Sequence, residues 1–404
     1  MSNIPEKVIV PFSPPDVTAA EEKAVQDVLQ SGWITTGPQV SQFERELSDY
    51  CGTDRTVVLS SATAALELTL RLLGIGAGDE VITTAYTFSA TAAAIHHVGA
   101  SIVLVDVAPN SFFMDLNCLN KAITPNTKAI IPVDIGGVMA DYASILRIAD
   151  DARSMFHPAS PLQEQLGRVA IIADGAHSLG ATSKGLNSGQ AADFTVFSFH
   201  AVKNLTTAEG GAVTWNSTFG MLSGNIHREL TCMALHGQTK SALDKSKPGA
   251  WDYDIVLPGY KCNMTDIAAA MGRVQLQRFP NMLVRRRQLI RCYDQVCNDL
   301  NLDHLIHQGD DFASSGHLYL LLLPSHMISR DEFISRMSEL GIACNVHYKP
   351  LPLLTAYKEL GFNIVDFPNS FSMFSREVTL PLFSRMTDAQ IEYTCAHMTR
   401  VLTS

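Results

Sequence analysis

Residues 55–215 alternate between short apolar runs rich in β-branched residues and stretches with helical periodicity. This alternation constrains the fold more than any other feature, because strands that alternate with helices form a parallel or mostly parallel sheet covered on both faces. The last two expected strands are joined by a connection that is short for a helical crossover, so that pair is expected to be antiparallel. The expected strands are 56–59, 81–84, 102–105, 129–133, 169–173, 195–199 and 212–215.

The sequence changes in character at about residue 266. A helix is expected at 16–32, long helices interrupted at Pro280 after residue 266, strands at 317–323 and 342–347, and a last helix at 387–402. We therefore predict a large α/β domain over residues 1–265, with an N-terminal arm, and a smaller α+β domain over residues 266–404. The segment 155–168 is long for a connection, which predicts a surface excursion.

Composition excludes several classes of function. The chain has 404 residues, is 46% hydrophobic and 17% charged, and carries a net charge of −10, which argues against nucleic-acid binding. No run of about 18 apolar residues indicates a membrane span. The eight cysteines contain no C-x-x-C, so neither a metal site nor a dithiol redox site is predicted. A chain of this kind without a recognisable signal peptide is expected to be cytoplasmic, with reduced thiols.

A single lysine, Lys203, lies in the uncharged connection between the last two expected strands. Most lysines in loops are solvated surface charges. The neighbours of Lys203 are small or apolar, however, and no acidic residue adjoins it in sequence. A lysine held in such surroundings can have a lowered pKa and act as an amine nucleophile.

Three other features lie at the ends of expected strands. Thr63 and its serine neighbours crowd the first turn of a helix, where they form either a simple N-cap or a phosphate site. Asp174, with His177 three residues later, is either a turn former or an anion for a cationic ring nitrogen. Phe88 offers an aromatic ring for stacking. With Lys203 for an aldehyde, these features match the requirements of pyridoxal phosphate (PLP).

The chain resembles the DegT/DnrJ group of nucleotide-sugar aminotransferases, a branch of the fold-type-I PLP enzymes. This resemblance implies the three-layer PLP-dependent transferase fold, an α/β fold with a mostly parallel seven-stranded sheet between helices and a smaller C-terminal α+β domain. It covers about residues 8–402 and is carried by "SGWITTGPQVSQFE" (31–44), "SSATAALEL" (60–68), "GDEVITTAYTFSAT" (78–91), "DGAHSLGA" (174–181), "SFHAVKNLTTAEGGAV" (198–213), "LPGYKCNMTDIAAAMGRVQL" (257–276), "VHYKPL" (346–351) and "LPLFSRMTD" (380–388).

The resemblance also implies roles for the matching residues. Lys203 is the catalytic residue and links covalently to the cofactor aldehyde, while Asp174 pairs with the pyridine nitrogen. Phe88 stacks on the ring, and His177 lies beside the ring or its hydroxyl. The phosphate is held by Ala62, Thr63 and Ser198.

Enzymes of this group are similar in being homodimers with shared active sites. The stretch borrowed from the partner is "GYKCN" here, so Lys261 and Asn263 stand where many relatives have G-x-N-x-R. Lys261 could meet the cofactor phosphate as a point charge. Thr36 is expected near the sugar. His347 and Tyr348 are either substrate contacts or core residues of the small domain.

The implied reaction moves an amino group from glutamate to a keto group of a nucleotide-linked sugar, with 2-oxoglutarate as product and pyridoxamine phosphate as the intermediate form of the cofactor. The chain looks closest to the branch that acts at C4 of UDP-linked 4-keto sugars, for amino-sugar and surface-polysaccharide synthesis. The alternatives are a PLP-dependent sugar dehydratase, in which relatives replace the lysine with His, and a non-catalytic regulatory protein. Lys203 favours amino transfer.

Two further expectations concern residues outside these motifs. Asp134 stands where many relatives have a histidine, which could alter sugar recognition. The arginines at 285–287 are expected on a solvated helix face, although one of them could meet a nucleotide diphosphate.

Overall fold

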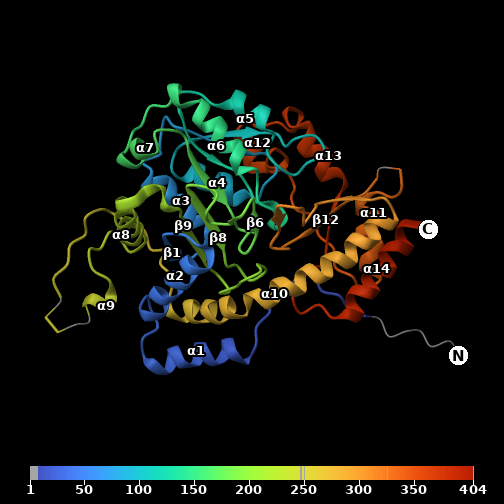
Figure 1. The fold of residues 1–404 in the computed structure, drawn as a ribbon, viewed down its shortest axis with the longest axis horizontal. Helices are drawn as coiled ribbons and strands as arrows, with labels where there is room; N and C mark the ends of the chain where they lie inside the picture. Colours follow the sequence, from blue (N-terminus) through green and yellow to red (C-terminus); the bar gives the residue numbers. More distant parts are fainter. Residues whose placement is uncertain (1–7, 246–247, 250, 325, 404) are drawn as a thin grey trace.

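A seven-stranded sheet forms the centre of the computed structural model, which describes residues 8–245, 248–249, 251–324 and 326–403 (Figure 1). The strand order is β1-β9-β8-β5-β4-β2-β3. β9 is antiparallel to both of its neighbours and the other pairs are parallel, as the short connection between β8 and β9 predicted. The strands are β1 (Arg55–Leu59), β2 (Glu80–Thr84), β3 (Ser101–Val105), β4 (Thr127–Ile131), β5 (Ala170–Asp174), β8 (Phe194–Ser198) and β9 (Gly211–Trp215).

Helices cover both faces of this sheet because its strands are apolar on both sides. Val57 and Leu59 of β1 pack in one core with α3 (Ala62–Leu72), α4 (Ser89–His97) and α8 (Ser223–Ala234). The intervening Val58 lies in the opposite core, as the two-residue period of a strand requires. That opposite face is covered by α2 (Pro38–Cys51), α5 (Leu116–Ala122), α6 (Tyr142–Asp151) and α10 (Asp266–Asp299). The predicted three-layer α/β fold is confirmed.

The strand directions decide where functional side chains can gather. All strands of the sheet except β9 run the same way, so their carboxyl ends meet at one edge. Ligands of open α/β sheets bind in the crevice outside this edge. The residues that follow β1, β2, β5 and β8 are those that the sequence marked as site candidates.

A second region is built around the antiparallel sheet of β10 (Asp303–His304), β12 (Tyr319–Leu322) and β13 (Glu377–Leu380) (Figure 1). The N-terminal segment joins this region, because Val10 bridges to Ile342. The division into domains 1–265 and 266–404 stays a prediction. The region contains α11 (Arg330–Glu339), α12 (Thr355–Glu359), α13 (Pro368–Arg376) and α14 (Asp388–Thr403).

The remaining elements are short, apart from α1 (Ala19–Ser31), which confirms the helix expected at 16–32. Thr18 and Glu21 form a capping box at the start of α1. The others are α7 (Pro161–Leu166), α9 (Ala242–Lys245), β6 (Thr182–Ser183), β7 (Leu186–Asn187) and β11 (Phe312–Ala313).

Two expectations of regular structure were wrong. α10 runs through Pro280 without interruption, because packing against α1, α2 and α14 outweighs the roughly 3 kcal/mol cost of an internal proline. Residues 342–347 form no strand. They make isolated bridges at Ile342 and Asn345, after which the chain leaves the small sheet and enters the cavity described below.

One expectation of solvent exposure was also wrong. Arg286 is buried because it donates to the carbonyls of Gly316 (3.2 Å) and Leu382 (3.0 Å), so residues 285–287 do not form a solvated face. The segment 155–168 lies at the surface, as predicted, with Met155, residues 157–159 and Glu164 exposed. It contains α7, and buried Gln163 donates to the last turn of α3 at the carbonyl of Leu73 (2.8 Å).

None of the helices in the described part of the chain combines the length and hydropathy that a bilayer-spanning helix needs. The same residues contain no cluster of three or more His, Cys, Asp or Glu side chains that could bind a metal ion. All eight cysteines are free.

A buried ion pair fixes the two strands that carry most of the site. Arg168 donates to both oxygens of Asp193 (2.7 and 2.8 Å), and Asp193 also accepts from the amide of Ile171 at the start of β5 (2.8 Å). Asp193 directly precedes β8, so this one carboxylate joins β5 to β8. Both members of the pair are buried.

We predict that Asp193→Ala lowers the free energy of unfolding by about 3 kcal/mol, because it leaves the buried guanidinium of Arg168 with only the more exposed Asp150 as an ion-pair partner (3.4 Å). Urea unfolding measures this loss. The matched control is Asp27→Ala, which removes the exposed Lys23–Asp27 pair and is expected to cost less than about 1 kcal/mol. Equal losses in the two variants would contradict the assignment.

Candidate active site

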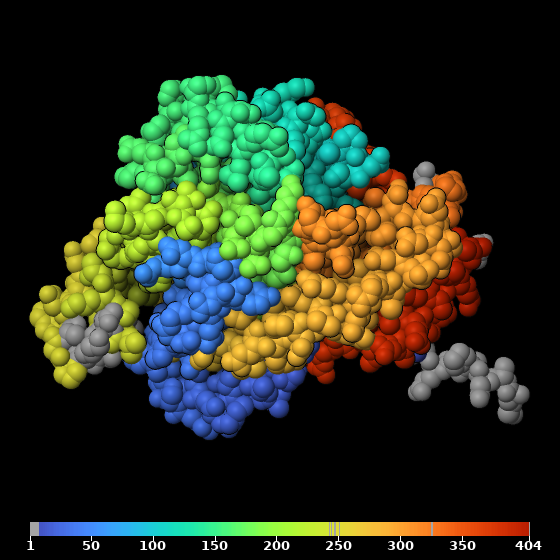
Figure 2. Space-filling view, viewed as in Figure 1, coloured from blue at the N-terminus to red at the C-terminus, as the bar shows by residue number. Residues whose placement is uncertain are grey.

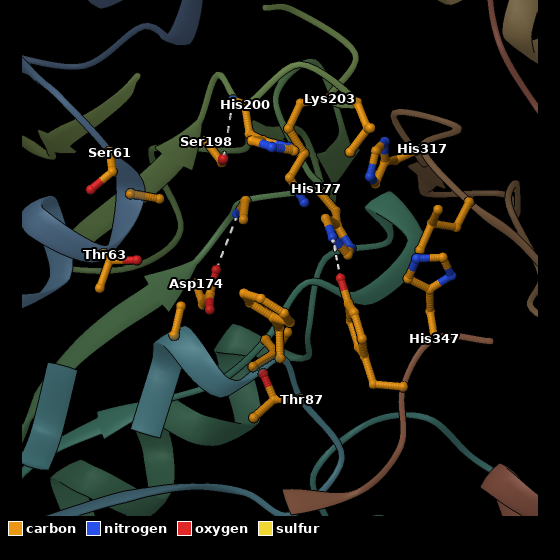
Figure 3. A pocket seen from close by; sticks show the side chains of 18 of the residues that line it. Ser61, Thr63, Thr87, Asp174, His177, Ser198, His200, Lys203, His317 and His347 are labelled. Carbon is orange, nitrogen blue, oxygen red and sulfur yellow. Dashed lines mark hydrogen bonds between the residues drawn. The ribbon is translucent and has the colours of Figure 1, made fainter. Parts of the chain in front are cut away.

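A cavity of about 330 Å³ opens where the carboxyl edge of the large sheet meets the C-terminal region (Figure 3). Its walls combine the ends of β5 and β8 with the first turns of α3 and α4, and loops of the C-terminal region complete them. A cavity of this size suits a small ligand such as a cofactor. It brings together the predicted residues Ala62, Thr63, Phe88, Asp174, His177, Ser198, Lys203, His347 and Tyr348.

Three predicted residues do not line this cavity. Thr36, Lys261 and Asn263 form a separate cluster beside β1, with Thr36 donating to the carbonyl of Met264 (2.6 Å). Asn263 donates to the Thr36 hydroxyl (2.6 Å) and accepts from Lys261. Within a single chain, these three residues are therefore connected to one another and not to Lys203.

Lys203 follows β8 in a turn that its own amide closes on the carbonyl of His200 (2.9 Å). Its side chain lines the cavity, and within the described residues its amino group has no hydrogen-bond or ion-pair partner. Burial lowers the pKa of Lys203 to about 8, although the nearby Asp174 carboxylate opposes that shift. Lys203 is therefore a free amine with an appreciable neutral fraction near pH 7.

Asp174 is the last residue of β5 and is buried. Its carboxylate accepts from the Thr91 hydroxyl of α4 (2.7 Å) and from the amide of Ala176 (3.2 Å). Burial raises the pKa of Asp174, while these two hydrogen bonds and the positive charge of Lys203 act in the opposite direction. The anion is therefore fixed in place at the floor of the cavity.

His177 and Tyr348 join the two halves of the cavity. The amide of Gly136 donates to Nδ1 of His177 (3.2 Å), and Nε2 lies 2.9 Å from the Tyr348 hydroxyl (Figure 3). A backbone amide can only donate, so the proton of neutral His177 resides on Nε2 and is donated to Tyr348. Burial, together with the charges of Lys203 and His347, lowers the pKa of His177 well below its usual value.

Sequence reasoning missed His317 and Asn204. The Asn204 amide donates to the carbonyl of Ser315 (2.9 Å), so its oxygen accepts from Nδ1 of His317 (2.9 Å). The ring of His317 lies 4.3 Å from that of His177, measured between centroids. Asn204, the residue that follows Lys203, thereby links the turn that carries the lysine to the C-terminal region. The single asparagine after the lysine was the only sequence signal for this contact.

The first turn of α3 forms a cradle for an anion. The Ser61 hydroxyl accepts from the amide of Ala64 (3.1 Å), while the amides of Ala62 and Thr63 remain available at the positive end of the helix. A Cβ atom at Gly211 would lie within 3.0 Å of the Ala62 amide nitrogen. Gly211, which the sequence indicated only as part of a turn, therefore keeps the cradle open.

Phe88 presents an aromatic face on the cavity wall. It is 60% exposed, which is unusual for a phenylalanine, and its ring lies 5.7 Å from that of Tyr348 between centroids. Across the cavity, exposed His200 lies near Glu209 at the rim, with 3.8 Å between Nε2 and Oε1. An open aromatic face above a fixed carboxylate suits a planar cationic ring.

Comparison with known proteins identifies the family. The sequence model of the DegT/DnrJ/EryC1/StrS aminotransferase family matches residues 15–399. Among curated proteins, the spore coat polysaccharide biosynthesis protein SpsC of Bacillus subtilis is 35% identical over 390 residues, which are 95% of this chain and 94% of SpsC.

Solved structures agree in fold. The structure titled "Putative sugar aminotransferase Spr1654 from Streptococcus pneumoniae, PMP-form" has a TM-score of 0.94 and 47% identity, over 98% of this chain and 99% of that one. The PLP-form of the same protein has a TM-score of 0.93 and 46% identity, with coverages of 98% and 99%. Helicobacter pylori PseC, an aminotransferase involved in pseudoaminic acid biosynthesis, has a TM-score of 0.85 and 26% identity, with coverages of 98% and 100%.

The cavity fits the PLP of these enzymes. Lys203 offers an unpartnered amine, Asp174 a fixed anion, and Phe88 an exposed aromatic face. The first turn of α3 offers free amides at a point that a Cβ atom on Gly211 would obstruct. Each chemical group of PLP thus has a suitable counterpart, and PLP is the cofactor of this enzyme. The chain belongs to the DegT/DnrJ/EryC1/StrS family and is a PLP-dependent aminotransferase.

Proposed function

We propose that the enzyme transfers the amino group of glutamate to the C4 keto group of a UDP-linked sugar, in the synthesis of an amino sugar for a surface polysaccharide. The observation that carries the proposal is the free amine of Lys203 in a cavity that also holds the fixed carboxylate of Asp174. The sugar aminotransferase of S. pneumoniae and the polysaccharide biosynthesis protein SpsC support a sugar acceptor. The cytoplasmic location expected from the sequence stays a prediction.

PLP, when bound, acts as an electron sink that stabilises a carbanion at the carbon bearing the amino group. Lys203 performs the proton transfers. Its amine would act as the base that takes the proton from the α-carbon of the donor amino acid, and as the acid that gives the proton back during the transfer. The lysine is suited to this task because it is tethered in the cavity wall, and because burial lowers its pKa to about 8, so that part of it is neutral near pH 7.

Asp174 is proposed to hold the pyridine nitrogen in its protonated form. The hydrogen bonds from Thr91 and Ala176 orient the carboxylate, so that one position of the ring is favoured. Phe88 would stack on the ring, and the His177–Tyr348 pair would lie beside it. The amides of Ala62 and Thr63, with the Ser198 hydroxyl, are the proposed phosphate ligands, and the helix end favours the negative charge.

We also propose a homodimer with shared active sites. Thr36, Lys261 and Asn263 lie away from the cavity of their own chain, which supports a role in the cavity of a second copy. The segment before Lys261 projects at one margin of the molecule (Figure 2). Trp251, Ile255 and Val256 on this segment are 78%, 53% and 58% exposed. Such an apolar surface is typical of a protein interface.

The proposed reaction is tested by incubating the enzyme with 15N-labelled glutamate and a panel of UDP- and dTDP-linked keto sugars. We expect 15N at C4 of a UDP-linked product, detected by NMR. Lys203→Ala is expected to lower the rate by at least about 10²–10⁴-fold, because the proton-transfer group is lost. Lys121→Ala changes an exposed lysine and is expected to have no effect. Near-normal turnover in Lys203→Ala would refute the mechanism.

The pH dependence of cofactor capture tests the environment of Lys203. Because only the neutral amine attacks the aldehyde, the rate of PLP capture by the apoenzyme should rise roughly tenfold per pH unit below pH 8 and level off above it. Stopped-flow absorbance measures the rate. A model lysine amine, with its pKa near 10.4, should show the rise continuing to about pH 10. The same profile for enzyme and model amine would contradict a lowered pKa.

The phosphate cradle is tested by Gly211→Ala. The added methyl group would displace the first turn of α3, so we expect the dissociation constant of PLP to rise by at least about tenfold, which corresponds to about 1.4 kcal/mol. Equilibrium titration of the apoenzyme measures it. Gly224→Ala on α8 is the control, because a Cβ atom there meets nothing within 4 Å and PLP affinity should not change.

A further inference from the structure

A buried carboxyl group lies two hydrogen bonds from the ring of His347. Nδ1 of His347 is 2.8 Å from the Thr379 hydroxyl, and that hydroxyl is 2.5 Å from Oε1 of Glu377. The other oxygen of Glu377 accepts from the backbone amide of His347 (2.9 Å). Glu377 and Thr379 are fully buried in β13, whereas His347 lines the cavity. The three side chains form a continuous chain from the interior to the cavity.

The direction of these hydrogen bonds depends on whether Glu377 carries a proton. When Glu377 is ionised, Thr379 must donate to it and therefore accepts from Nδ1–H of His347, which leaves Nε2 with a lone pair. When Glu377 is protonated, it can donate to Thr379, which then donates to Nδ1. The proton of neutral His347 is in that case on Nε2. Nε2 makes no hydrogen bond within the described residues and is available to a ligand.

Within the part of the chain that the structure describes, no cation contacts Glu377 directly. Arg330 is the nearby cation, but it donates to the carbonyl of Phe374 (2.6 Å) and pairs with Asp331 (2.9 Å). Burial raises the pKa of Glu377 to about 8, although the hydrogen bonds from Thr379 and His347 and the charge of Arg330 oppose this shift. The other titratable groups that interact with this carboxylate are Tyr86, Cys344 and Tyr348.

His347 itself cannot easily store a proton as an imidazolium ion. Burial and the charge of Lys203 lower the pKa of His347 to about 4. A second positive charge beside Lys203 is therefore disfavoured. A route that passes a proton through a neutral imidazole to an anionic carboxylate avoids that second charge.

We propose that Glu377, acting through the Thr379 hydroxyl, determines which nitrogen of His347 carries the proton, and so makes His347 a neutral proton donor or acceptor toward the keto sugar. The proton balance is simple. As Nε2 takes up one proton, Nδ1 passes one to Thr379 and Thr379 passes one to Glu377. His347 remains neutral and the carboxylate becomes a carboxylic acid. The inference rests on the proposed function and on one of the two alternatives that the sequence left open for His347, a substrate contact, for which Glu377 is a positioning residue.

The first test reads the tautomer of His347 directly. In 15N NMR spectra of histidine-labelled enzyme, assigned by comparison with His347→Ala, the wild-type ring should change from Nε2–H to Nδ1–H between pH 7 and 9. Glu377→Gln should hold it at Nε2–H throughout, because the Gln carbonyl oxygen keeps the hydrogen bond from the His347 amide and the NH2 group then donates to Thr379. Thr379→Val breaks the link while keeping Glu377 and should also abolish the change. Unchanged behaviour in both variants would overturn the relay.

The second test separates this inference from the proposed function. Lys203 also titrates near pH 8, so wild type and Glu377→Gln are compared at each pH in kcat/KM for the keto sugar. In wild type, kcat/KM should change roughly tenfold between pH 7 and 9 because of Glu377, in addition to the change caused by Lys203. This additional change should be absent in Glu377→Gln. In a His347→Ala background, Glu377→Gln should have no effect on kcat/KM. Thr394→Val, which removes a buried hydroxyl on α14, should match wild type.

Two results of the second test would overturn the relay. An equal effect of Glu377→Gln with and without His347 would indicate a general structural role for the glutamate. Full activity in His347→Ala would refute the substrate role of His347, and the relay with it. Neither result would affect the assignment of Lys203, whose test uses a different variant and the transfer of 15N from glutamate.

Discussion

The burial of one amine constrains most of the chemistry around it. Lys203 lies in a cavity where burial disfavours its charge, and Asp174 is the one anion close enough to offset this among the groups that shift its pKa. The residual positive charge then acts on its neighbours, and it contributes to the lowered pKa values of His177, His317 and His347. The cavity therefore holds several imidazoles that are neutral at pH 7. Neutral imidazoles can act as directed donors and acceptors, and hydrogen bonds from the backbone and from Asn204 fix which role His177 and His317 take.

The cavity depends equally on hydrogen bonds between segments that are far apart in sequence. Gly136 donates to His177, and its carbonyl accepts from the amides of His317 (3.1 Å) and Leu318 (3.2 Å). Ser315 donates to the carbonyl of Gly137 (3.0 Å) through its amide and to that of His177 through its hydroxyl.

Arg286 holds the carbonyl of Gly316 from the opposite side. The loop at 314–318 is thus bound simultaneously to α10 and to the loops after β4 and β5. This arrangement gives buried Arg286 a structural task, and it explains why the periodicity of the surrounding helix was misleading about its exposure.

The sequence was sufficient to predict the layers of the fold and the site residues that lie at the ends of the strands. Asp174 and Ser198 follow apolar runs, and parallel strands place such residues at a common edge, so their proximity to Lys203 was predictable. Gly211, Asn204, His317 and Glu377 were not predicted, because their significance arises from contacts made across the fold. Gly211, for example, looks like any turn glycine until the first turn of α3 is seen against it. Pro280 failed as a helix breaker for a related reason, since tertiary packing overrides local propensity.

Asp134 shows how a departure from the family pattern can be accommodated. It accepts from Tyr142 (2.7 Å), Ser178 (2.6 Å) and the amide of Ala140 (2.9 Å), and it is fully enclosed. Burial raises its pKa to about 6 despite these hydrogen bonds. Its position supports the loop that carries His177 rather than the open cavity, so the expected effect on sugar recognition would have to be indirect.

The shortage of positively charged side chains in the cavity supports the proposed sharing of active sites. Among the described residues that line the cavity, Lys203 is the only lysine or arginine. The proposed ligands include the cofactor phosphate, the two carboxylates of glutamate and a nucleotide diphosphate. The helix end at Ala62 suits one of these anions, and Lys203 is committed to the chemistry. At least one further cation is needed, and Lys261 is exposed, follows the exposed apolar segment at residues 251–256 and does not line the cavity of its own chain. A second copy that brings its Lys261 to the rim would meet this need without placing another charge beside Lys203 in the same chain.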